Sequence, residues 1–127
     1  MDSFNYNSGD LFCEGVAVAD IVAAAGSPVF IYSTATLLHH YRAIADAFKP
    51  LNPLIAYSIK SLSNIHILKL LADAGSGFDV VSGGELARAA AIGADPAKIV
   101  YAGVGKTDAE ISQAVVAGIS LFNVESE

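Results

Sequence analysis

Apolar residues in the second half of the chain follow two alternating patterns. Four short apolar runs begin at residues 54, 78, 99 and 121, so they recur every 21 to 24 residues. Each run has the length and side-chain composition of a strand. Between consecutive runs, apolar residues recur every three or four positions, which indicates a helix. Strands and helices that alternate at this spacing form parallel sheets, so the pattern predicts an α/β fold.

Start and stop signals bound each predicted helix of this repeat. Ser63 is expected to cap the first helix. Ser82 with Glu85, and Thr107 with Glu110, have the spacing of a capping box, in which two side chains satisfy backbone N–H groups at the start of a helix. The apolar stripes are followed by glycines that can end the helices, namely Gly75, Gly93 and Gly118.

The first part of the chain is less regular. Residues 1–27 are mixed, although residues 16–25 predict a short apolar helix that Gly26 can end. Residues 29–32 predict a strand, and residues 34–49 place apolar side chains on one face of a helix. A further strand and helix are therefore expected before the repeat.

Two architectures fit the repeat, a doubly wound open sheet and part of a (β/α)8 barrel. The strand expected at residues 54–59 helps to choose between them, because alternate side chains point to opposite faces of a strand. One face is bulky, whereas the other carries Ala56, Ser58 and, at the strand end, Lys60. A face of small residues that ends in a functional side chain is typical of a barrel interior, whose active site lies at the carboxyl ends of the strands. The sequence therefore favours a partial barrel.

Composition excludes some partners and suggests a compartment. Only 16% of the residues are charged and 54% are hydrophobic, so the chain has more apolar surface than it can cover by itself. The formal net charge is -6 and the basic residues are scattered, which argues against nucleic acid and anionic membranes as partners. Cys13 has no second cysteine, no signal peptide is evident, and no apolar run has the length of a membrane span. These features predict a soluble, cytoplasmic protein.

Two lysines that follow predicted strands are candidates for chemistry. A buried lysine at the position of Lys60 could serve as a nucleophilic amine, but position alone favours a side chain that reaches solvent. Lys106 follows Gly103-Val104-Gly105, yet this spacing fits neither a P-loop nor a dinucleotide-binding fingerprint. No pair of histidines has the spacing of metal ligands.

Residues 57–64 resemble the tyrosine–x–x–lysine–x–x–serine–asparagine motif of the alanine-racemase-like pyridoxal phosphate (PLP) enzymes. Ser61 and Leu62 stand where that family usually has alanine and asparagine. Three further segments resemble motifs at later strand ends of the same family, namely residues 77–85, 101–106 and 122–127. Residues 4–6 and 26–33 are more similar to the bacterial diaminopimelate decarboxylases than to ornithine or arginine decarboxylases.

The resemblance implies roles for individual residues. Lys60 would be the catalytic lysine, which binds PLP covalently through its amine. Asp79 would lie beside the cofactor and orient that amine. Ser82 would also contact the cofactor, although capping of the following helix is its simpler role. Glu125 would line the mouth of the barrel.

The resemblance also implies a fold, a domain plan and a reaction. Residues 34–127 would form about the first half of a PLP-binding (β/α)8 barrel, and residues 1–33 would be an N-terminal segment that joins a C-terminal β-domain. The whole enzyme would be a homodimeric carboxy-lyase with a small amino-acid substrate. It would convert meso-2,6-diaminopimelate to L-lysine and CO2, the last step of lysine biosynthesis.

Alternatives to this function stay open at the level of sequence. The substrate could instead be ornithine, arginine or carboxynorspermidine, as in related decarboxylases. A different class is a non-catalytic half-barrel that binds PLP or associates with itself through exposed strand edges. The 127-residue chain by itself is expected to lack decarboxylase activity and to self-associate, because a whole (β/α)8 barrel takes about 250 residues.

Overall fold

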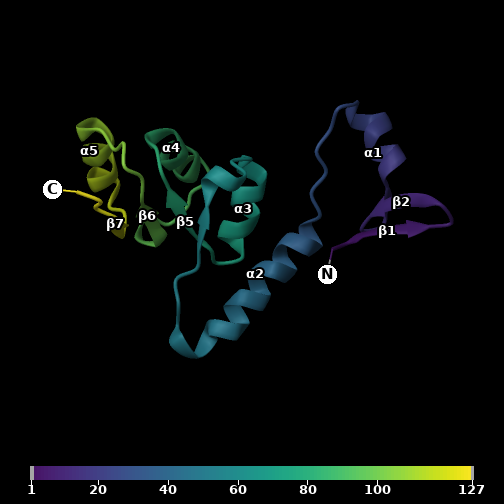
Figure 1. The fold of residues 1–127 in the computed structure, drawn as a ribbon, viewed down its shortest axis with the longest axis horizontal. Coiled ribbons are helices and arrows are strands. Elements are labelled where there is room, and N and C mark those ends of the chain that lie inside the picture. The colour runs from purple at the N-terminus through teal and green to yellow at the C-terminus, as the bar shows by residue number, and fades with distance from the viewer. Residues whose placement is uncertain (1, 127) are drawn as a thin grey trace. The chain divides into compact units, whose positions relative to one another are not determined.

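The computed structural model describes residues 2–126 and is drawn as a ribbon in Figure 1. The chain divides after Lys49 into two compact units. The first unit holds a small antiparallel sheet and two helices, and the second holds a parallel sheet with its connecting helices. The domain boundary expected between residues 33 and 34 stays a prediction.

The first unit begins with the antiparallel sheet. Strand β1 (Phe4–Asn7) pairs with β2 (Asp10–Cys13), and β2 pairs with β3 (Val16–Ala17). Ser8 and Gly9 turn the chain between β1 and β2 with positive φ angles of 52° and 94°. This sheet is not among the elements predicted above, although a Ser-Gly pair between two short runs that contain aromatic residues is a hairpin signal.

Two helices complete the first unit. Helix α1 (Val18–Ala25) starts two residues later than predicted and ends at Gly26 as expected. Helix α2 (Thr34–Phe48) agrees with the predicted helix, and Ser33 caps it. The strand predicted at residues 29–32 is wrong, because these residues pair with no other strand among residues 2–126. Without a partner, the backbone N–H and C=O groups of an extended segment have no ladder to join.

The second unit repeats strand and helix three times and ends with a fourth strand, as the sequence predicts. The parallel strands, in their order in the sheet, are β4 (Ala56–Ser58), β5 (Gly77–Val80), β6 (Ile99–Tyr101) and β7 (Leu121–Phe122). The connecting helices are α3 (Ile65–Asp73), α4 (Gly83–Ala91) and α5 (Asp108–Ala117). Because the strands are parallel, their carboxyl ends meet at one side of the sheet, which we call the carboxyl edge.

All three of these helices cover the same face of the parallel sheet. The core between helices and sheet consists of buried side chains from both layers: Leu68, Phe78, Val80, Leu86, Ala89, Ile99, Tyr101 and Ala114. Each large apolar side chain buried in this way contributes about 1.5–3 kcal/mol. A doubly wound sheet carries helices on both faces, whereas a barrel wall carries them on the outer face only. Within this unit, the arrangement is therefore that of a barrel segment.

Side-chain caps set where α4 and α5 begin. Thr107 and Glu110 form the complete capping box that the sequence predicts. The hydroxyl of Ser82 accepts the N–H of Glu85 at 3.3 Å, which is half of the second predicted box. The other half differs, because the Glu85 carboxylate accepts the N–H of Val81 at 2.8 Å and not that of Ser82.

The N-cap of helix α3 lies one residue after the predicted one. Its N-cap is Asn64 and not Ser63. The amide oxygen of Asn64 accepts the N–H of His66 at 2.9 Å. Asparagine caps helices at least as well as serine, so the residue that directly precedes the helix takes this role.

Candidate cofactor site at the carboxyl edge

Lys60 lies at the carboxyl edge, but it is not part of the strand. Strand β4 ends at Ser58, and Lys60 is the middle residue of the short 3-10 turn η2 (Ile59–Ser61). The predicted strand through Ile59 is thus one residue too long, although Ile59 is fully buried in the core, on the face that the strand alternation predicts. The turn leaves Lys60 exposed. Among residues 2–126, its ammonium group has no hydrogen-bond or ion-pair partner.

Asp79 stands at the same edge on the neighbouring strand. Ser58 and Asp79 are direct partners in the register of β4 and β5, and turn η2 packs beside β5. The Ser58 hydroxyl donates to Oδ2 of Asp79 at 3.2 Å. Both residues are half-buried and lie on the sheet face opposite the core. The sequence predicted Lys60 and Asp79 as site residues but not Ser58, whose place in the motif is variable.

The start of α4 is held by internal hydrogen bonds. Ser82 accepts the N–H of Glu85, so capping accounts for its position. The N–H of Gly83, the first residue of the helix, donates to Oε1 of Glu110 at 2.7 Å. The structure therefore brings Ser82 to the carboxyl edge, next to the strand that carries Asp79. A contact between Ser82 and the cofactor stays a prediction.

Glu110 connects the starts of two helices through one carboxylate. Its Oε2 accepts the N–H of Thr107 at 3.0 Å and the Thr107 hydroxyl at 2.9 Å, while Oε1 accepts the N–H of Gly83. The backbone N–H groups of Thr107 and Gly83, and then the Thr107 hydroxyl, lower the pKa of Glu110 from 4.5 to about 2. Hydrogen bonds to a carboxylate favour its charged form, so Glu110 is ionised across the physiological range.

Replacing Glu110 by glutamine is expected to lower the urea midpoint of unfolding at neutral pH. The folded-state pKa lies below the unfolded one, so the stabilisation is complete above about pH 4.5 and is lost as the pH falls through about 2. The difference between wild type and Glu110→Gln should therefore shrink between these two pH values. Asp108→Asn makes the same charge change in the same helical turn and serves as the control. A difference that does not vary with pH would contradict the assigned role.

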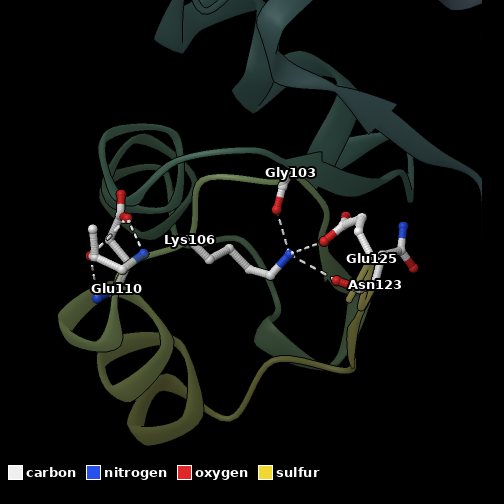
Figure 2. Close-up of polar contacts among 6 residues, drawn as sticks. Gly103, Lys106, Glu110, Asn123 and Glu125 are labelled. Atoms are coloured by element: carbon white, nitrogen blue, oxygen red, sulfur yellow. Dashed lines mark hydrogen bonds and ion pairs between the residues drawn. The ribbon is translucent and has the colours of Figure 1, made fainter. Parts of the chain in front are cut away.

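Lys106 lies on the third strand-end loop of this edge, and its side chain, which is 10% exposed, reaches toward the loop after β7, as Figure 2 shows. Its ammonium donates to the backbone carbonyls of Gly103 and Asn123, the latter at 2.8 Å. It also forms an ion pair with Oε2 of Glu125 at 3.0 Å. The sequence singled out Lys106 and Glu125 separately, but only the fold shows that the two side chains meet.

A free primary amine and a carboxylate at the same sheet edge are suited to one kind of chemistry. The exposed Lys60 amine can attack an aldehyde, and Asp79 can hold or orient a proton at that amine. These residues fit the aldehyde end of PLP. In contrast, the first N–H of α4 is not available to a phosphate, because the Gly83 N–H already binds Glu110.

Comparison with known proteins identifies the family. Residues 34–127 match the pyridoxal binding domain of the pyridoxal-dependent decarboxylases. The chain belongs to this family. Its predicted membership among the PLP decarboxylases is thereby confirmed, and PLP is the cofactor of the family.

Curated relatives of this pyridoxal-dependent decarboxylase chain carry a more specific name. The diaminopimelate decarboxylases of Pseudomonas aeruginosa and Vibrio cholerae are 46% and 48% identical to it over 99% and 100% of its length. The chain spans 30% and 31% of the length of these two relatives.

Solved structures agree with this decarboxylase fold. AQ1208 from Aquifex aeolicus superposes with a TM-score of 0.93 at 43% identity, over 98% of this chain and 30% of that protein. Diaminopimelate decarboxylase from M. jannaschii in complex with L-lysine gives 0.94 at 34% identity, with the same two coverages. The predicted partial PLP barrel is thus confirmed. No helix within residues 2–126 combines the length and the apolar character that crossing a membrane requires.

Proposed function

We propose that this chain supplies the lysine-bearing part of the PLP site of a diaminopimelate decarboxylase. The observation that carries the proposal is the Lys60 amine at the carboxyl edge, unpaired among residues 2–126, in the turn that directly follows the strand whose last residue, Ser58, pairs with Asp79. The family match accounts for the cofactor, and relatives that are 43–48% identical share one enzymatic name.

Each residue of the site has a distinct task in this proposal. Bound PLP supplies the electron sink that makes loss of CO2 possible. Lys60 holds the cofactor covalently through its amine, and Asp79 keeps that amine correctly oriented and protonated at the stage that needs it. Ser58 fixes one oxygen of Asp79, which limits the rotation of the carboxylate. Ser82 lines the same edge after β5 and is proposed as a further contact to the cofactor.

For the substrate we propose meso-2,6-diaminopimelate, with L-lysine and CO2 as products. One similar structure is a diaminopimelate decarboxylase that holds L-lysine. A lysine/ornithine decarboxylase from Vibrio vulnificus also superposes with a TM-score of 0.79, but at 24% identity it shows a shared fold alone. The second candidate, a related decarboxylase for ornithine, arginine or carboxynorspermidine, rests on the sequence resemblance and gains no support from this match.

A chimera tests this proposal directly. The chain would replace the matching segment of the Pseudomonas aeruginosa diaminopimelate decarboxylase, to which it aligns over 126 residues. We expect the chimera to release CO2 from diaminopimelate in the presence of PLP and not from ornithine or arginine. Lys60→Ala in the same chimera should abolish release, whereas Lys69→Met, on the exposed surface of α3, should not. A folded chimera that turns over only ornithine or arginine would overturn the substrate assignment.

Location and assembly belong to the same proposal. The single cysteine, Cys13, is a free thiol, which fits the reducing environment of the cytoplasm. We propose a homodimer as the working form of the whole enzyme. Sedimentation of the chimera, compared with that of the parent enzyme, tests whether this chain supports the same assembly.

A further inference from the structure

The two lysines of the carboxyl edge have opposite environments. The Lys60 side chain is exposed and unpaired among the described residues, whereas the Lys106 side chain is only 10% exposed. An ammonium group has three N–H donors. Those of Lys106 match three acceptors: the carbonyl oxygens of Gly103 and Asn123 and the carboxylate of Glu125. An ammonium whose three donors are all engaged has none left for a ligand.

The acceptors of Lys106 come from two different loops. Gly103 precedes it in the loop after β6, while Asn123 and Glu125 follow β7. Figure 2 shows the side chain extended across the gap between these loops, with its Nζ at the centre of the three acceptors. Hydrogen bonds from a charged donor are roughly twice as strong as neutral ones, and a low-dielectric site strengthens them further. Lys106 therefore ties the two loops to each other.

The loop after β6 is also tied to the loop after β5. Gly103 has a φ of +106°, and a Cβ there would lie 3.1 Å from the carbonyl oxygen of Val81, so the two backbones approach closely. On the other side of Lys106, Thr107 shares the Glu110 carboxylate with Gly83. The three loops are thus joined in series. We call residues 79–83, 103–107 and 123–125 the rim.

We propose that Lys106 is a positioning residue that holds the rim, and with it the loop that follows Asp79, in the geometry that the cofactor needs. The expected effect of Lys106 on PLP binding rests on the proposed function. The expected effect of Lys106 on the rim does not. Misplacement of a site by about 1 Å can cost about a hundredfold in function, so a residue that never touches the cofactor can still control its binding.

Hydrogen exchange of single backbone amides tests the first step. The Asn123 N–H is bonded to the carbonyl of Tyr101, and the Thr107 N–H to Glu110, so both report on the rim. The Gly77 N–H, bonded to Ile55 at the other end of the sheet, is the internal reference. In Lys106→Met, exchange at Asn123 should rise about tenfold or more, with no comparable change at Gly77. Unchanged exchange at Asn123 would overturn the proposal.

A matched variant separates this effect from the general loss of an ion pair. Lys69→Met removes the lysine of the exposed Lys69–Asp73 pair on α3 and should leave Asn123 unaffected. Where Lys106→Met does not fold, Glu125→Gln is decisive, because it removes one charge and leaves both carbonyl acceptors. A smaller rise at Asn123 in Glu125→Gln supports the inference, and no rise contradicts it.

The second step is read out by PLP itself. The PLP concentration that half-saturates borohydride-trapped labelling of Lys60 should rise about tenfold in Lys106→Met and stay unchanged in Lys69→Met. Faster exchange at Asn123 with unchanged labelling would make Lys106 a purely structural residue and overturn its positioning role. Absence of labelling in the wild type would instead refute the proposed function, and the exchange experiment alone would then decide whether Lys106 holds the rim.

Discussion

Borohydride reduction of the chain in the presence of PLP is expected to attach the cofactor to Lys60 and to leave Lys106 unmodified. The Lys60 amine is exposed and unpaired among the described residues. The Lys106 ammonium is nearly buried, and its three donors are engaged by Gly103, Asn123 and Glu125. Only an amine that can lose its proton and reach the aldehyde reacts. Mass mapping of peptides after reduction measures the label on each lysine.

Two variants make this labelling experiment specific. Lys60→Ala should remove nearly all of the label, because Lys60 is the lysine in the turn that directly follows the strand paired with Asp79. Lys69→Met should retain it, since Lys69 lies on the exposed face of α3. A label spread over the exposed lysines, or one that survives Lys60→Ala in full, would show that PLP reacts with surface amines without a site.

Gly77→Ala is expected to be the most destabilising small substitution in the second unit. A Cβ at Gly77 would lie 2.2 Å from the carbonyl oxygen of Lys98 and 2.9 Å from Cδ1 of Leu54. The first of these atoms belongs to the backbone next to β6, so it cannot move without disturbing the sheet. Overpacking of this kind typically costs about 1–3 kcal/mol, and a backbone clash should reach the upper end of that range or exceed it. The shift in the urea midpoint measures the cost.

Gly105→Ala is the control for this prediction. A Cβ at Gly105 meets no atom within 4 Å, and its φ is not among the positive ones. Its effect should stay within about 0.5 kcal/mol, as for most exposed substitutions. Similar midpoints for Gly77→Ala and Gly105→Ala would mean that the loop before β6 is softer than its contacts suggest.

The strand–helix repeat could be predicted because local signals and burial agree in the second unit. Apolar runs such as residues 99–101 become strands, and the capping box of Thr107 and Glu110 forms in full. Predictions failed where the structure of a segment depends on contacts with residues far away in the chain. The apolar run at residues 29–32 has the composition of a strand but finds no partner strand among the described residues. Ile59 packs in the core on the face that the strand alternation predicts, but β4 ends before it because the chain turns at Ile59–Ser61.

Only part of the candidate site could be predicted from the sequence. Lys60 and Asp79 follow from a recognisable motif, and strand order explains why they share one edge. The Ser58–Asp79 hydrogen bond depends on the register between two strands, which no local pattern encodes. The meeting of Lys106 with Glu125 depends on loops that are 19 residues apart in the chain. Such contacts appear only once the sheet has assembled.

The carboxylate of Glu110 occupies a backbone N–H at the start of α4 that could otherwise bind an anion. The first N–H of a helix normally attracts phosphate groups, because its donor is free and the helix dipole is positive there. At α4 that donor binds an internal carboxylate whose pKa of about 2 keeps it charged at any pH at which the protein would work. A phosphate that approached α4 would meet negative charge and an occupied donor. Under the proposed function, the phosphate of PLP would therefore have to be held by groups other than the Gly83 N–H.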